Sequence, residues 1–340
     1  MTLRDLRDRV ESEFFKHFGG SWRGVAAHWE RLLQLPPKGS PRRCRANIFV
    51  GQMNQPLLAQ GVIQGAAGSD GWRLQKEGFK SGAGLDEIAD MHLNEVVGYL
   101  DELLGVPVIG DYPNALNGLQ VQNSGGLSKI GAAVDACEAV IGEAAAEGVD
   151  FLLVHHGLFW GGLAPLSGAA YRKTRMLLEA DMAVYSAHLP LDVHPRFGNN
   201  ALLADALGLE NGEPFFTEFG QPIGWKFEAE LNREVLRDLI EQAVGGRVHL
   251  APGGPVVARK IGIVTGGAGG AVDRAVKEGV DTFITGEGPH WSFNAAEELG
   301  INLFYAGHYA SETFGVKALA EELSKKFALP WQFIDHPTGL

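Results

Sequence analysis

Residues 147–157 read EGVDFLLVHHG, and residues 278–288 read EGVDTFITGEG, 131 positions further along the chain. The same offset relates the KIG tripeptides at 129–131 and 260–262, and it relates Trp160 to Trp291. A single offset that holds without a gap indicates an internal duplication. Because the repeat is long and only two copies are present, it predicts two related units and not a solenoid.

A further pair of segments extends the duplication at a different offset. YSAH at 185–188 parallels YAGH at 305–308, now 120 positions apart. Four residues after its histidine, each segment reaches a carboxylate, which is Asp192 in the first copy and Glu312 in the second. The two copies therefore carry related polar clusters.

From Met91 onward, short apolar runs alternate with segments of helical periodicity. The expected strands are 130–134, 151–154, 183–186, 261–264, 282–284 and 303–306. The expected helices are 92–104, 138–147, 200–207, 235–244 and 312–327. The alternation predicts an α/β fold, and the continuous apolar run at 151–154 predicts a strand buried on both faces.

Residues 1–90 differ in pattern from residues 91–340. One amphipathic segment at the N-terminus is followed by the breaker-rich stretches PPKGSPRRCRAN and GSDGWRLQKEGFKSGAG, and no periodicity persists. We expect residues 1–90 to be an N-terminal extension of unknown role, poorly ordered or mistranslated from upstream sequence, with a small accessory domain as the alternative. Residues 91–340 are expected to form the main domain, with one unit at 91–209 and the other at 210–340.

Composition argues against several classes of protein. The formal net charge is −12, and an acidic chain is a poor general binder of phosphate backbones, so we do not expect a nucleic-acid partner. Two cysteines without a CxxC pair argue against a disulfide framework and a thiolate zinc site, and they fit a reducing compartment. The chain has no apolar run long enough to span a membrane and no secretory signal at its charged N-terminus. We therefore expect a cytoplasmic protein.

Histidines and carboxylates gather directly after three of the expected strands. His155 and His156 follow 151–154, and adjacent residues on an extended chain point to opposite sides, so two neighbouring metal ions share them more easily than one. A lone histidine pair is more often an ordinary polar pair than a pair of ligands. The segments from His188 and from His308 each add a carboxylate four residues on, which lies on the same face of a helical turn. Three such clusters favour a site for Zn, Fe, Mn, Co or Ni.

Together, these motifs resemble the Nif3-like family. The resemblance rests on HHG at 155–157, SAHLPLD at 186–192, GHYASE at 307–312, NGLQV at 117–121 and the glycine-rich turn at 265–270, and it covers about residues 91–340. It implies two intertwined α/β units with mixed sheets, a ring-shaped homo-hexamer, and two divalent metal ions at the interface of the units. The implied ligands are His155, His156, Asp192, His308 and Glu312, with His188 orienting Asp192 or contacting substrate.

The chain departs from the family pattern at two places, and two further features remain open. Residues 1–90 have no family counterpart, and DYPNA at 111–115 replaces a shorter run, which we expect to matter little to the ligands. The glycines at 266–270 suit a bound phosphate, although such glycines are more often structural. Glu287 is a candidate general base, with a solvated loop carboxylate as the alternative.

Two functions of different classes follow from this sequence. The first is a metal-dependent hydrolase acting on a small, nucleotide or phosphate-bearing substrate, similar to GTP cyclohydrolase I type 2 by resemblance, in which two metal ions activate water. No P-loop motif is present to support GTP specifically. The alternative is a metal-binding scaffold or regulator that acts through protein partners. Five protein ligands on two metal ions would leave coordination positions open, which favours the enzyme over the scaffold.

Overall fold

The computed structural model describes residues 44–52, 55–64, 73–74, 86–162 and 164–340. The chain divides into two compact units, Met1–Gly82 and Ala83–Leu340. In the first unit, an antiparallel sheet has the order β1-β2-β3. Its strands are β1 (Cys44–Gln52), β2 (Gln55–Gln64) and β3 (Arg73–Leu74). The amphipathic segment predicted at the N-terminus lies outside the described residues.

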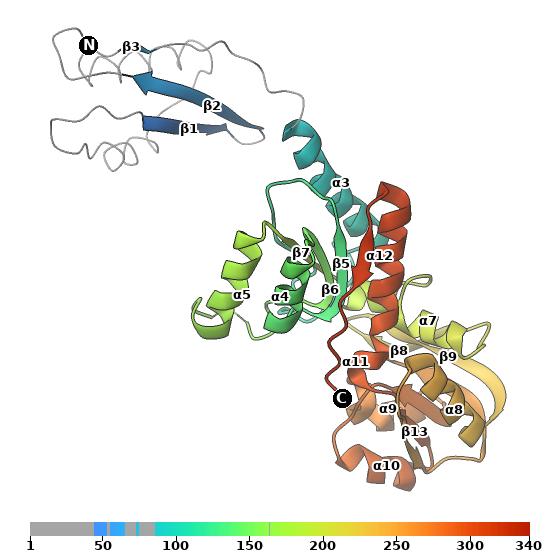
Figure 1. Cartoon of the computed structure of the whole chain (residues 1–340). Helices are drawn as coiled ribbons and strands as arrows, with labels where there is room; N and C mark the ends of the chain where they lie inside the picture. The colour runs from blue at the N-terminus through green and yellow to red at the C-terminus, as the bar shows by residue number, and fades with distance from the viewer. Residues whose placement is uncertain (1–43, 53–54, 65–72, 75–85, 163) are drawn as a thin grey trace. The chain divides into compact units, whose positions relative to one another are not determined.

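The second unit contains the two copies of the repeat (Figure 1). Its first part comprises α3 (Asp86–Leu104), β4 (Gly118–Val121), β5 (Ile130–Asp135), α4 (Glu138–Ala146), β6 (Phe151–His156), α5 (Gly168–Glu179), β7 (Ala183–Ser186), α6 (Leu189–Asp192) and α7 (Asn199–Ala206). Its second part comprises β8 (Glu213–Glu218), β9 (Gln221–Asn232), α8 (Arg233–Val244), β10 (His249–Pro252), β11 (Val257–Ile263), η1 (Ala268–Ala271), α9 (Val272–Lys277), β12 (Thr282–Thr285), α10 (Trp291–Leu299), β13 (Asn302–Tyr305), α11 (His308–Ser311), α12 (Thr313–Phe327) and β14 (Trp331–Phe333).

The two sheets of this unit repeat one arrangement, which confirms the predicted duplicated α/β fold. In the first sheet, β5, β6 and β7 are parallel and β4 is antiparallel to β7. In the second, β11, β12 and β13 are parallel and β10 is antiparallel to β13. Even the antiparallel strands keep the sequence offset, because β4 begins at Gly118 and β10 at His249, 131 positions later. Both sheets are therefore mixed, as expected.

The copies are intertwined because the end of the chain returns to the first sheet. β14 pairs in parallel with β5, which gives the sheet order β14-β5-β6-β7-β4. Helix α12 packs beside α3 on the same face of this sheet, through Val316, Leu319 and Leu323. In the second sheet, the strand that pairs with β11 at the position equivalent to β14 is β9, which belongs to the second copy. Residues 313–333 thus complete the sheet of the first copy of the repeat and not that of the second.

Strand β6 lies at the centre of the first sheet and is covered on both faces. Phe151 and Leu153 face the α3–α12 layer, whereas Leu152 and Val154 face the layer of α4 and α5. All four side chains are fully buried, which stabilises the fold by roughly 1.5–3 kcal/mol for each side chain. This packing fixes the carboxyl end of β6, where the histidine pair stands.

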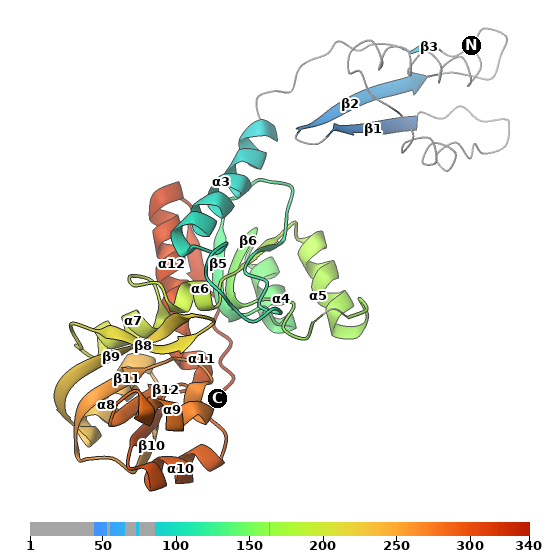
Figure 2. The same cartoon turned by 180° about the vertical axis from the view of Figure 1, so that it is seen from behind.

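The second sheet is likewise covered on both faces (Figure 2). Helices α7 and α8 pack on one face, against Ile261 and Ile263 of β11. Helices α9 and α10 pack on the other, against Phe283 of β12 and Leu303 of β13. The second sheet is thus packed between two helical layers, as the first sheet is.

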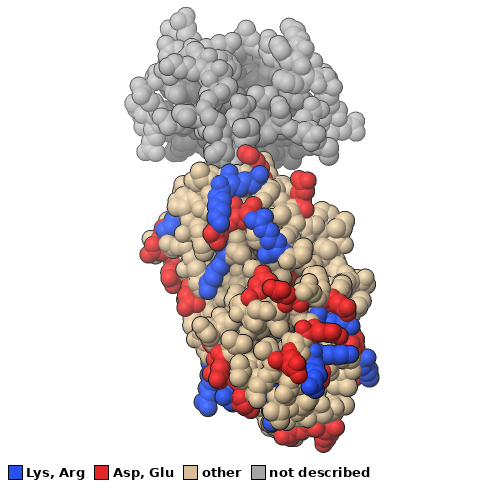
Figure 3. All heavy atoms as spheres, turned by 90° about the vertical axis from the view of Figure 1, so that its right-hand side faces the viewer, with Lys and Arg blue, Asp and Glu red and all other residues tan. Residues whose placement is uncertain are grey.

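Charged side chains of both signs are interspersed on the face of the second unit that Figure 3 shows. Among the helices that the structure describes, none combines the length and the apolar character that a membrane-spanning helix needs.

Candidate metal centre

Four histidines converge where strands of the two sheets end. His155 and His156 are the last two residues of β6, His188 follows β7, and His308 follows β13. The carboxyl ends of parallel strands are the usual binding edge of an α/β sheet. The ring centroid of His156 lies 5.4 Å from that of His308, so the two copies of the repeat meet at this point.

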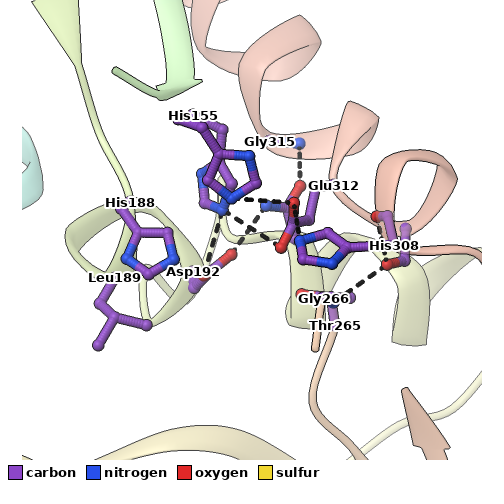
Figure 4. A network of polar contacts seen from close by, with 12 residues as sticks. His155, His188, Leu189, Asp192, Thr265, Gly266, His308, Glu312 and Gly315 are labelled. Carbon is purple, nitrogen blue, oxygen red and sulfur yellow. Dashed lines mark hydrogen bonds and ion pairs between the residues drawn. The ribbon is translucent and has the colours of Figure 1, made fainter. Parts of the chain in front are cut away.

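Two carboxylates from one-turn helices complete the cluster (Figure 4). Asp192 ends α6, and its Oδ2 lies 3.5 Å from His155 Nε2. Glu312 follows α11, and its Oε1 also lies 3.5 Å from His155 Nε2. The second oxygen of Glu312 lies 3.4 Å from His156 Nε2 and 3.2 Å from His308 Nε2. Glu312 is thus placed between histidines of both copies.

The outer ring nitrogens of the histidines are all occupied by hydrogen-bond acceptors. His155 Nδ1 lies 2.8 Å from the carbonyl oxygen of Ala187. The other three contacts, each 2.9 Å long, join His156 Nδ1 to Asp135, His188 Nδ1 to Asp111 and His308 Nδ1 to Glu287. These acceptors keep a proton on Nδ1, so each ring in its neutral form presents the Nε2 lone pair, which is the form that binds a metal ion.

Inner donor atoms of the cluster lack conventional partners. His155 Nε2 and Glu312 Oε2 are buried and have no hydrogen bond among the described residues. Leaving such groups unpartnered in a protein interior costs free energy, and a bound cation would satisfy both. Imidazole nitrogens and carboxylate oxygens together form a donor set for divalent transition metals. The residues present therefore fit a metal centre.

The geometry defines two overlapping groups of ligand atoms, each gathered within 4.8 Å. One group contains His155, His156 and His188, and the other contains His156, His308 and Glu312. Asp192 borders the first group through its contact with His155. His156 belongs to both groups.

Electrostatics in the metal-free centre favour charge on both partners. Burial alone lowers the pKa of His155, but Asp192 and Glu312 more than offset it, and the pKa lies well above its ordinary value. Burial also opposes protonation of His308, yet Glu312 and Glu287 raise its pKa to about 9. Conversely, burial would raise the pKa of Glu312, but the imidazoles hold it well below the usual range. A metal ion must therefore displace protons from these imidazoles.

Two buried asparagines join the halves behind Asp192. Asn199 donates to Asp192 Oδ1 at 2.8 Å and accepts from the backbone amide of Gly315 in α12 at 2.7 Å. Asn200 donates to the carbonyl of Asp192 and accepts from the backbone amide of Thr265 at 2.7 Å. These bonds fix Asp192 relative to the second copy.

The glycine-rich turn packs directly against the ligands. Gly266 has φ +70°, and a Cβ added to it would lie 2.2 Å from Glu312 Oε1. A Cβ on Gly267 would lie 3.7 Å from the His308 ring. The turn needs glycine both for its left-handed backbone and for the close approach of Glu312.

An aromatic wall borders the site on one side. The Trp160 ring stands edge-on to His188 at 4.7 Å and to His156 at 5.6 Å between centroids. Tyr112 lies beside both Trp160 and His188, and it also contacts Phe219. Trp160 is thus a wall residue of the site.

The structure brings the five predicted ligands together, and His188 with them. The carboxylate bonded to His188 is Asp111, so its Nδ1 does not orient Asp192 as the sequence suggested. Asp111 belongs to the DYPNA segment, which was therefore wrongly considered of little importance to the ligands. Glu287 lies behind His308, bonded to Nδ1, and not at the inner donor atoms.

Several contributing residues escaped the sequence analysis. Asp111 is 77 positions from its histidine, and no motif connects them. Asp135 ends β5 in register with His156, a signal that pairing of the two predicted strands would have revealed. Asn199 and Asn200 begin α7, and only Asn200 lies within the helix predicted at 200–207.

Comparison with known proteins identifies the family of this chain. A family model described as Duf34/NIF3 (NGG1p interacting factor 3) matches residues 91–338. The chain belongs to this family. Its NIF3 region contains every residue of the metal centre, whereas residues 1–90 lie outside the match.

Curated relatives and solved structures cover the same NIF3 region. The "GTP cyclohydrolase 1 type 2 homolog" of Deinococcus radiodurans is 41% identical over 250 residues, covering 73% of this chain and 94% of the relative. The protein of the same name from Archaeoglobus fulgidus is 40% identical over 250 residues, covering 74% and 100%. The crystal structure of TTHA1606 from Thermus thermophilus superimposes with a TM-score of 0.67 at 42% identity, covering 74% and 100%.

Proposed function

We propose that this NIF3-family chain is a metal-dependent hydrolase whose centre holds two divalent ions and acts on a small substrate. The observation that carries the proposal is the pair of overlapping ligand groups sharing His156, with unpartnered buried donors on His155 and Glu312. Two ions in a site of this kind activate water and polarise the bond to be hydrolysed. The metal is one of Zn, Fe, Mn, Co or Ni, given the nitrogen and oxygen donors.

Different side chains would hold the two ions. His155, with Asp192, would serve one position, and His308 would serve the other. Glu312 reaches the imidazoles of both copies with its two oxygens, which suits a bridging carboxylate. Five ligand residues, His155, His156, Asp192, His308 and Glu312, would leave open positions on two ions, as a catalytic site requires. Trp160 restricts solvent on one side of the His156 and His188 rings.

The proposed substrate class is inferred from the names of the relatives. Proteins 41% and 40% identical to this chain are named "GTP cyclohydrolase 1 type 2 homolog". A nucleotide or another phosphate-bearing molecule is therefore the substrate that we propose to test first.

A second candidate is a metal-binding scaffold that acts through protein partners. The family description, NGG1p interacting factor 3, is the observation that favours it. The two candidates differ in what the loaded protein does to a small molecule, because a scaffold releases no product.

Assays of the metal-loaded full-length chain distinguish these functions. We expect release of formate or phosphate from GTP or a related nucleotide, and loss of that release in Glu312→Ala. The surface variant Glu179→Ala, which removes an exposed partner of Arg175, is the matched control. A fully loaded protein that turns over no member of a nucleotide and phosphoester panel would favour the scaffold.

We also propose that the chain works as a homo-hexamer in the cytoplasm. The proposal follows from the family resemblance and from a composition poor in cysteine.

A further inference from the structure

The two copies of the repeat use equivalent positions for different tasks. Glu287 occupies in the second copy the position of His156 in the first, 131 residues apart. Likewise, His308 corresponds to His188, at the offset of 120. In the second copy the pair is a carboxylate bonded to a histidine, with 2.9 Å between Glu287 Oε1 and His308 Nδ1. In the first copy both members are histidines that face the centre.

Because histidines stand at both of these positions in the first copy, neither histidine can bond to a carboxylate at the other position. Other segments supply one carboxylate for each histidine. Asp135 ends β5 in direct register with His156 and bonds to its Nδ1. Asp111, from the segment that follows α3, bonds to His188 Nδ1 and also accepts from the amide of Leu189. Of the four histidines, the three that lack a backbone acceptor therefore each have a carboxylate on the outer nitrogen.

The second copy has no space for side chains at the positions equivalent to Asp135 and His155. Gly266 is the repeat counterpart of Asp135, and any Cβ there would collide with Glu312. Gly286 is the counterpart of His155, and its Cβ would lie 2.7 Å from the carbonyl oxygen of Gly266. The second copy thus presents backbone to the centre where the first presents side chains, and Glu287 is the carboxylate that remains for His308.

We propose that Asp111, Asp135 and Glu287 are positioning residues that hold His188, His156 and His308 with Nε2 toward the metal, and that Glu287 is not a general base. A general base must reach the attacking water within about 2.6–3.2 Å. The bonded oxygen of Glu287 instead lies across the imidazole ring from the Nε2 that faces Glu312. The proposal rests on the metal-binding part of the proposed function and is independent of hydrolysis.

Metal affinity of single variants tests these roles. Zinc alone is titrated into metal-free full-length protein in competition with a chromogenic chelator. We expect Glu287→Ala and Asp135→Ala to bind zinc about 10–100-fold more weakly, the loss typical when a carboxylate behind a metal-bound histidine is removed. Glu287→Gln, whose amide oxygen still accepts from Nδ1, should lie between the alanine variant and the wild type.

Asp335→Ala is the matched control, because Asp335 accepts from the hydroxyl of Tyr309, the residue after His308, but touches no imidazole of the centre. It should bind zinc as the wild type does. The side chain of Glu287 is 42% exposed, so its removal leaves no buried cavity. Cobalt-substituted protein adds a spectroscopic readout, since a reoriented His308 changes the ligand-field spectrum.

Wild-type zinc affinity in Glu287→Ala, with turnover lost, would overturn the proposal in favour of a general base. An equal loss in Asp335→Ala would also overturn it, because the effect would then be structural. A wild-type protein that binds zinc but hydrolyses nothing would contradict the proposed hydrolase while leaving these affinity differences intact.

Discussion

Replacing Gly266 by alanine tests whether the glycine turn shapes the metal centre. Its Cβ would lie 2.2 Å from Glu312 Oε1, and ordinary contact begins at 3.4 Å. The carboxylate would have to retreat by about 1 Å, whereas metal–ligand distances tolerate only about 0.2 Å. Glu312 is buried between three imidazoles, so this movement removes it from them. We expect metal affinity to fall at least 100-fold, more than the roughly 10–100-fold loss of a supporting residue.

The backbone of Gly266 adds a separate effect on stability. At φ +70° an alanine costs roughly 1–2 kcal/mol, which lowers the Tm by about 2–8 °C in a unit of this size. Gly300→Ala is the matched control, since Gly300 has φ +72° and nothing within 4 Å of an added Cβ. Both variants should therefore lose stability through the backbone, but only Gly266→Ala should lose metal.

Chelator competition and thermal unfolding measure the two effects on the same samples. Gly266→Ala protein that binds two metal ions with wild-type affinity would refute the placement of Glu312 in the centre. A metal loss of the same size in Gly300→Ala would show that backbone strain, and not the contact with Glu312, is responsible.

Three further results are expected. Asn199→Ala should lower the free energy of unfolding by about 1–3 kcal/mol in denaturant titrations, because Asp192 and the Gly315 amide lose a buried partner; unchanged stability would contradict this. Since the pKa of His308 is raised to about 9, protons compete with the metal ion below that pH, so metal affinity should increase from pH 6 to 9; a flat chelator-competition profile would contradict this expectation. The same pKa shift stabilises the fold without metal below pH 6.5, and this contribution is lost as pH rises through about 9. Light scattering on purified protein should give six times the mass of one chain, and a monomer would exclude the hexamer.

The sequence predicted the parts of the fold that repeat or that are strongly apolar. Duplication is visible in the chain because strand ends and turns kept the same residues in both copies. The run 151–154 identified β6, since a strand buried on both faces needs no polar alternation. Strand β14 was missed because its three residues carry little periodicity and pair with β5, about 200 positions away in sequence. Helix α3 begins at Asp86, upstream of the predicted start.

The ligands could be found from sequence, whereas most of their supports could not. His155, His156 and the two His–carboxylate pairs are close in sequence to one another or to a strand end. The supporting contacts instead join distant segments, such as Asp111 to His188 and Asn199 to Gly315. Such pairs depend on tertiary packing, so a single sequence contains no local signal for them. Glu287 was noticed through the repeat, but only the structure shows that it bonds to His308.

Elemental analysis of metal per chain, on full-length protein purified without an affinity tag, tests the metal centre most directly. We predict about two divalent ions per wild-type chain, as in carboxylate-bridged pairs. The double variant His308→Ala, Glu312→Ala should remain folded and hold far less metal. Wild-type protein that contains no metal and takes up none on dialysis, or a double variant with unchanged metal content, would contradict the account.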